Sequence, residues 1–225
     1  MKNIMAIDVV GGSILTGALD VIAQSLTIPV LIILLIIFIL AVIDLGSLIA
    51  EYGSRKKITL PEIKKLIYQI NQSQTPTQIK NTINSNTQLP DSDKKILNEI
   101  ADIKDLTPKT REALACKMID NEEEKIDNKL RKTDIITKIG PTLGLMGTLI
   151  PLGPGLAALG TGDINTLANS LTVAFNTTIV GIGAGALAYF EGRIRKNWYM
   201  KYISDLDILS DAILDTLNHT KQEEY

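Results

Sequence analysis

The chain has 225 residues, of which 45% are hydrophobic and only 4% aromatic, and its formal net charge is −2. With a pI near 5.5 it lacks the basic surplus of a nucleic-acid-binding protein, so we expect no nucleic acid as a partner. The single cysteine, Cys116, excludes an internal disulfide, and the single histidine, His219, leaves little material for catalysis or a metal site. We therefore expect no enzyme, no cofactor and no metal.

The N-terminal part predicts a surface helix followed by a membrane span. In residues 5–26, apolar side chains recur at helical spacing, which predicts an external, interfacial amphipathic helix in segment 1–26. Residues 21–43 carry no charge and contain an almost wholly apolar run, Pro29–Leu40. Because a helix rises about 1.5 Å per residue and a hydrocarbon core is about 30 Å thick, we assign the first transmembrane helix to 27–50.

Segment 51–133 is polar but carries three helix-start signals, so it predicts a cytoplasmic helical domain. The first is Thr59-Leu60-Pro61-Glu62, and the second is the stretch that begins at Pro90. The third, Thr107-Pro108, places a capping residue before a first-turn proline. No breaker follows until Gly140-Pro141, so this helix is predicted to continue into the next span. Residues 71–86 are compatible with a short helix after Pro76 or with a loop.

Between Lys138 and Glu191 the chain runs for 52 residues with one charge, Asp163. The uncharged stretches on its two sides have 24 and 27 residues, and each is long enough to cross a bilayer. We therefore assign transmembrane helices to 134–160 and 164–190. Their content of Gly, Thr, Ala and Pro indicates faces that meet other helices or a pore.

The tail, 191–225, predicts a cytoplasmic C-terminal helix. One apolar stripe runs along it, formed by Tyr199, Tyr202, Leu206, Leu209, Ile213 and Leu217. This stripe is expected to pack antiparallel on the helix over 108–138. The predicted fold class is an all-α membrane protein, with three transmembrane helices and a cytoplasmic helical bundle that extends the second and third spans.

The distribution of cations sets the predicted orientation. Of the 23 Lys and Arg residues, 16 lie in 51–133, and only Lys2 lies in a segment assigned to the outside. The positive-inside rule then places the N-terminus outside and the C-terminus in the cytoplasm, in a multi-pass protein of the cytoplasmic membrane.

Small and hydroxyl side chains line one sector of each of the last two spans. On the second span the sector contains Thr137, Pro141, Gly144, Thr148, Pro151 and Gly155; on the third it contains Ser170, Ala174, Thr178, Gly181 and Gly185. Such faces serve close helix packing or line a narrow ion path, and the residues alone leave both interpretations open. Neither span has an ionisable side chain in its interior, so a proton path would need a carboxylate from a partner.

Gly140-Pro141-Thr142-Leu143-Gly144-Leu145-Met146-Gly147-Thr148 resembles the second-span signature of the MotA/TolQ/ExbB proton channel family. Ala174-Phe175-Asn176-Thr177-Thr178-Ile179-Val180-Gly181 is similar to that family's third-span stretch. The chain plan is also similar, and the compact loop favours the ExbB/TolQ branch.

The resemblance implies a ring of identical subunits, usually a pentamer, around a single-span partner of the ExbD/TolR/MotB type that supplies a membrane Asp. It implies that Thr148 and Thr178 line the pore. It assigns helix-packing or pore-adjacent positions to Pro141, Gly144, Gly147, Asn176 and Gly181. The expected function is that of a subunit of an ion-driven, energy-transducing membrane motor, with the proton as the expected ion. The alternative is a non-conducting membrane scaffold that anchors a larger complex.

Overall fold

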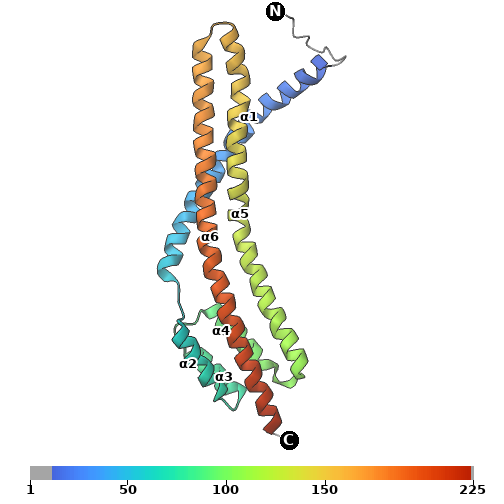
Figure 1. Cartoon of the computed structure of the whole chain (residues 1–225), viewed down its shortest axis with the longest axis vertical. Coiled ribbons are helices and arrows are strands. Elements are labelled where there is room, and N and C mark those ends of the chain that lie inside the picture. The colour runs from blue at the N-terminus through green and yellow to red at the C-terminus, as the bar shows by residue number, and fades with distance from the viewer. Residues whose placement is uncertain (1–11, 224–225) are drawn as a thin grey trace, which may run out of the picture. The chain divides into compact units, whose positions relative to one another are not determined.

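The computed structural model describes residues 12–223, and in this range every regular element is a helix (Figure 1). The elements are α1 (Gly12–Ser54), α2 (Leu60–Asn71), α3 (Pro76–Ser85), α4 (Asp91–Asp102), the short 3-10 helix η1 (Ile103–Asp105), α5 (Pro108–Gly160) and α6 (Ile164–Glu223). The predicted all-α class is therefore confirmed.

Three of these helices, α1, α5 and α6, are long and apolar enough to cross a membrane, as predicted. Helix α1 continues without interruption through the segments assigned to the interfacial helix and to the first span. The first eleven residues of the segment 1–26 lie outside the described residues, and the placement of this segment on a membrane surface stays a prediction. Pro29 lies inside α1, and α5 contains three prolines in its interior, after Pro108 at its first position.

The helix starts expected in 51–133 are present. At the start of α2, the backbone N–H and the hydroxyl of Thr59 both donate to the Glu62 carboxylate, at 2.7 and 2.8 Å. This local satisfaction of helix-end donors is what a capping sequence provides. Helices α4 and α5 begin at Asp91 and Pro108, next to the predicted signals. Of the two alternatives for 71–86, the helix is the one observed, as α3.

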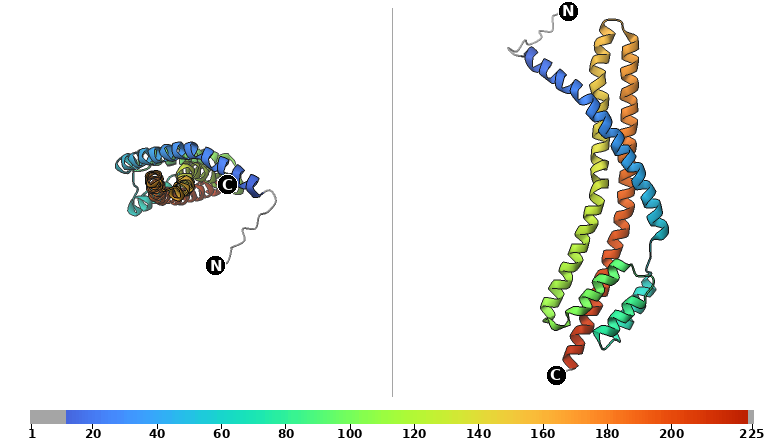
Figure 2. Two further views of the ribbon diagram at one scale, coloured as in Figure 1. Left: turned by 90° about the horizontal axis from the view of Figure 1, so that it is seen from above. Right: turned by 180° about the vertical axis from the view of Figure 1, so that it is seen from behind.

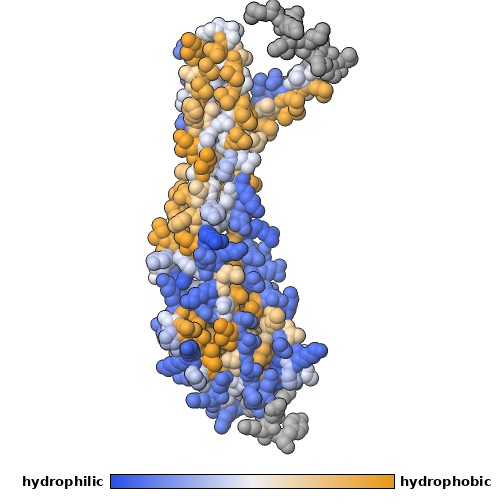
Figure 3. Space-filling view, in the orientation of Figure 1, coloured by the Kyte–Doolittle hydropathy of each residue, from blue (hydrophilic) through white to orange (hydrophobic). Residues whose placement is uncertain are grey.

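The chain divides into two compact units, which we describe separately. The hairpin unit comprises Met1–Ser47, described from Gly12 on, and Thr133–Glu191; the loop unit comprises Leu48–Lys132 and Gly192–Tyr225. Apolar surface covers most of the hairpin unit, whereas hydrophilic surface covers most of the loop unit (Figure 3).

In the hairpin unit, α5 and α6 run antiparallel and α1 packs across them (Figure 1). The contact with α1 is a small apolar cluster of Ile37, Ala41, Ile136, Ala184 and Ala188. The turn between α5 and α6 contains Gly162, whose φ of 81° lies in the left-handed region that favours glycine. The Asp163 carboxylate accepts a hydrogen bond from the Thr166 backbone N–H, at 3.0 Å, and caps the start of α6.

In the loop unit, α2, α3 and α4 pack with the N-terminal half of α5 and the C-terminal half of α6, an arrangement that the right view in Figure 2 helps to follow. The core contains Leu206, Leu209, Ile213 and Leu217, which are four members of the predicted tail stripe. Across it, the Arg111 guanidinium of α5 donates to the Leu217 carbonyl oxygen at 3.2 Å. The predicted packing of the tail on the 108–138 helix is thus observed over the part of α5 that lies in this unit.

Candidate functional site

The contact between α5 and α6 in the hairpin unit is made by glycines at backbone distance. A Cβ atom added to Gly181 would lie 2.6 Å from the Gly140 carbonyl oxygen and 2.7 Å from the Gly144 Cα. A Cβ added to Gly144 would lie 3.2 Å from the Gly181 Cα. Real Cβ atoms do not come this close to backbone, so the two helices can meet here only through glycine. We call this contact the glycine seam and define it by Gly140, Gly144, Gly147, Gly155, Gly181 and Gly185.

Other small side chains complete the seam. A Cβ on Gly147 would lie 2.7 Å from the Cβ of Thr177, a side chain that is 5% exposed. Near the turn of the hairpin, a Cβ on Gly155 would lie 2.8 Å from the Cβ of Ser170. The seam therefore extends over several turns of both helices and holds them at a short separation.

The two predicted pore threonines lie beside this seam and are half-buried. The Thr148 hydroxyl donates to the Leu145 carbonyl oxygen at 2.6 Å, and the Thr178 hydroxyl donates to the Ala174 carbonyl oxygen at 3.1 Å. Each hydroxyl proton is thus donated to a carbonyl oxygen of its own helix, whereas the lone pairs of the hydroxyl oxygen stay available as acceptors. The Thr178 Cα lies 3.6 Å from the position that a Cβ on Gly144 would take, which places Thr178 and Thr148 about one helical turn apart along the hairpin.

Of the other predicted residues, Gly144, Gly147 and Gly181 are buried in the seam, whereas Pro141 and Asn176 are exposed. Sequence reasoning missed Thr177 as a seam residue. It lies three positions after Ala174 and four before Gly181, so helical spacing admits it to the small-residue stripe but does not distinguish it from Thr178.

A second face of α6 is polar and exposed at the depth of the span. It carries Asn169, Thr172 and Asn176, all exposed in the single chain. The Thr172 hydroxyl is satisfied by the Ala168 carbonyl oxygen at 2.9 Å. Among residues 12–223, the Asn176 amide has no hydrogen-bond partner, so in hydrocarbon it would be costly.

In the loop unit, a charged network joins the end of α1 to α6. The Glu51 carboxylate accepts hydrogen bonds from the Arg195 Nε, at 3.1 Å, and from the Tyr199 hydroxyl, at 2.7 Å. Burial and the adjacent carboxylate raise the pKa of Tyr199 to about 12, so this hydroxyl stays protonated and acts as a donor.

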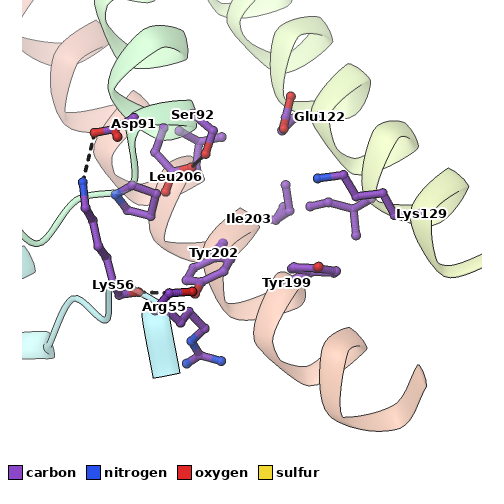
Figure 4. A pocket seen from close by; sticks show the side chains of 14 residues that line it. Arg55, Lys56, Asp91, Ser92, Glu122, Lys129, Tyr199, Tyr202, Ile203 and Leu206 are labelled. Carbon is purple, nitrogen blue, oxygen red and sulfur yellow. Dashed lines mark hydrogen bonds and ion pairs between the residues drawn. The ribbon is translucent and has the colours of Figure 1, made fainter. Parts of the chain in front are cut away.

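Next to this network lies a cavity of about 300 Å³, lined by the α1–α2 connection, the start of α4, α5 and α6 (Figure 4). Its polar wall includes Asp93, which is 6% exposed and accepts a hydrogen bond from the Ser92 hydroxyl at 2.9 Å. Desolvation raises the pKa of Asp93 to about 6, and the nearby Glu122 and Asp205 act in the same direction.

Metal chemistry has no candidate site in the described part of the chain, since no group of three or more His, Cys, Asp or Glu side chains there could hold an ion. Cys116 is exposed. The acidic run that begins at Glu122 lies on a solvated helix face, where Glu122 pairs with Lys125.

The fold and the glycine seam define a class, namely three-span helical membrane proteins whose last two spans form a closely packed hairpin. The sequence model of the MotA/TolQ/ExbB proton channel family matches residues 84–207, and the chain belongs to this family. The match covers α4, the whole of α5 and α6 as far as Asp207. No curated protein sequence matches the chain. The protein is therefore a multi-pass membrane protein of a channel and energy-transducing family, which is not a family of enzymes.

Proposed function

We propose that the protein is the ring-forming subunit of a proton-driven, energy-transducing complex in the cytoplasmic membrane, with five copies in the ring. Its N-terminus would face outward, and 51–133 and the tail would lie in the cytoplasm, where the 16 cations of that segment favour them.

The exposed amide of Asn176 is the observation that carries the proposal. A side-chain amide facing lipid would lose its hydrogen bonds to water and gain none, a cost of roughly 2 kcal/mol or more. A neighbouring copy or a water-containing path would satisfy Asn176 and its neighbours Asn169 and Thr172. Assembly around a polar interior accounts for both the position and the composition of this face.

The proposed ion path runs along Thr148 and Thr178. Their oxygens offer acceptor positions for water or a hydrated proton on two successive turns of the hairpin. The uncharged stretches on both sides of Asp163 contain no Asp, Glu, His, Lys or Arg. The proton-carrying carboxylate would therefore come from the partner, a single-span protein of the ExbD/TolR/MotB type.

The test is the double variant Thr148→Val, Thr178→Val, which removes both hydroxyls at nearly constant volume. Ring mass and proton uptake are scored on the same sample, purified with the partner and reconstituted. We expect a ring whose mass is five times the 24.5 kDa chain plus the partner, with proton uptake reduced about 10-fold or more, as for a lost ion-stabilising contact of 1.4 kcal/mol or more.

Thr142→Val is the matched control, because the Thr142 hydroxyl also donates to its own helix, to the Lys138 carbonyl oxygen at 2.9 Å, but lies on an exposed face. It should leave uptake unchanged. Normal uptake in the double variant would remove the channel proposal and favour the non-conducting scaffold instead. A monomer in several detergents would contradict the ring.

A further inference from the structure

A cation stacked on aromatic rings lies where α1 ends, within the loop unit. The Arg55 Cζ lies 4.5 Å from the ring centroid of Trp198 and 5.3 Å from that of Tyr202. The rings of Tyr52 and Trp198 are 5.9 Å apart, and the Lys57 Nζ lies 5.1 Å from the Tyr52 ring. We call these five residues the aromatic–basic cluster. Stacking of this kind holds the planar guanidinium in one orientation.

Within residues 12–223, four cations of this region have no carboxylate partner. Among the described residues, neither Arg55 nor Lys57 forms an ion pair with a carboxylate. The same holds for Arg193 and Lys196, two exposed cations less than two helical turns before Trp198 on α6. The neighbouring Lys56 and Arg195 differ, because they pair with Asp91 and Glu51. In Figure 4 the Arg55 side chain points away from Asp91.

The surroundings of the cluster are those of a membrane boundary. The uncharged stretch of α6 ends at Phe190, which is 59% exposed, and Arg193 and Trp198 follow it by about 5 and 12 Å along the helix axis. On α1, Ile49 is 67% exposed and lies one turn before Tyr52, itself 63% exposed. Tryptophan and tyrosine are enriched at the headgroup level, and unpaired juxtamembrane cations there attract anionic lipids.

We propose that the aromatic–basic cluster, together with Arg193 and Lys196, is a binding site for the headgroup of an anionic phospholipid. The phosphate and the anionic headgroup contact the cations, while Tyr52 and Trp198 lie at the level of the glycerol and upper acyl chain. A phospholipid fits better than free phosphate, because exposed apolar side chains adjoin the cations and would contact the acyl chains. The site requires only that the helices span a membrane, so it stands or falls independently of ion conduction.

The sequence supplies its own reporter, since Trp198 is the only tryptophan of the chain. We would reconstitute the full chain in bilayers of phosphatidylcholine and phosphatidylglycerol, with bromine on the acyl chains of one lipid or the other at equal mole fraction. Brominated lipid quenches Trp198 fluorescence only at contact distance. We expect brominated phosphatidylglycerol to compete for the site at least about five-fold better than brominated phosphatidylcholine, because about 1 kcal/mol from even one juxtamembrane cation corresponds to a factor of about five.

The test variant is Lys57→Gln, Arg193→Gln, Lys196→Gln, which removes exposed charges but keeps Arg55 stacked on Trp198. This variant should be quenched equally by brominated phosphatidylglycerol and brominated phosphatidylcholine, while the total quenching by the two lipids persists. The control removes three exposed lysines on η1 and the N-terminal part of α5, Lys104, Lys109 and Lys117, and should keep the preference.

Equal quenching by both lipids in the natural protein would overturn the proposal, and so would an unchanged preference in the test variant. Loss of preference in the control as well would assign the effect to net charge and not to this site. Glycerol phosphate added in solution should not change the quenching ratio; if it abolishes the preference, the site binds free phosphate instead of lipid.

Discussion

The hairpin unit and the loop unit each have their own kind of internal packing, and the two kinds are opposite. In the hairpin unit, α5 and α6 touch through glycine, and the closest approaches join backbone to backbone, as between Gly181 and Gly140. In the loop unit, large side chains such as Leu97, Leu209 and Ile213 are fully buried. Burial of apolar area stabilises a core in water. In lipid the surroundings are as apolar as the protein, so close packing of the helices takes the place of apolar burial as the stabilising contribution. The environment thus determines whether small or large residues are the stabilising ones.

The largest effect should come from truncation of the loop-unit core. Leu209 is 0% exposed, so Leu209→Ala should lower the free energy of unfolding by about 2–5 kcal/mol through lost burial and a cavity. Its neighbour Ile208 is 45% exposed, and Ile208→Ala should cost less than about 1 kcal/mol. Hydrogen exchange of the amides of α4 and α6 in the detergent-solubilised protein measures the loss of unfolding free energy in each variant. Equal losses in the two variants would contradict the conclusion that burial of large apolar side chains stabilises the loop unit.

In the hairpin unit the opposite change, an enlargement, should be the harmful one. Gly181→Ala places a methyl group against the backbone of α5 and should cost about 1–3 kcal/mol in a titration with a denaturing detergent. Gly183→Ala is the matched control, because a Cβ there would meet nothing within 4 Å. Both variants gain the same helix propensity, so their difference reports the seam alone. If the two variants unfold with the same free energy, the helices of the hairpin accommodate the added methyl group without cost.

The smallest effect concerns pH and should be confined to the loop unit. Since the folded-state pKa of Asp93 is raised to about 6, the folded state binds this proton more tightly than the unfolded chain does. Its stabilising contribution is complete below the unfolded pKa of about 4 and is lost as the pH rises through about 6.

Protection of α4 amides, corrected for intrinsic exchange, should therefore fall by about 1 kcal/mol between about pH 5 and pH 7.5. In Asp93→Asn this part of the change should be absent. The other polar groups near Asp93 include the carboxylates Glu122 and Asp205, the cations Arg55 and Lys56 and the hydroxyl of Tyr202. An identical pH profile in both proteins would show that Asp93 is ionised throughout.

Local signals allowed most of the fold to be predicted. Thr59 and Thr107 marked helix starts through capping chemistry that involves only neighbouring residues. For 71–86 two alternatives stayed open, because Asn, Gln, Ser and Thr have no strong preference, and α3 is fixed by burial of Ile79 and Ile83 against the rest of the core.

The details of the candidate site depended on contacts that no local pattern contains. Thr177 and Thr178 are adjacent and chemically identical, and only the register of the antiparallel helices decides that Thr177 enters the glycine seam. Asp93 looked like an ordinary acidic residue in a first helical turn, and its burial comes from packing within the loop unit. The stack of Arg55 on Trp198 joins residues that are far apart in the sequence.

The short turn at Gly162 and Asp163 has a consequence for biosynthesis. The span of α1 has a mean hydropathy of 3.4 and can enter the bilayer alone, whereas α5 and α6 reach only 1.5 and 1.6. A turn this short leaves no room for one of these weaker segments to cross while the other waits in water. We therefore expect the two segments to enter the membrane as a pair, with the glycine contacts between them formed as they enter.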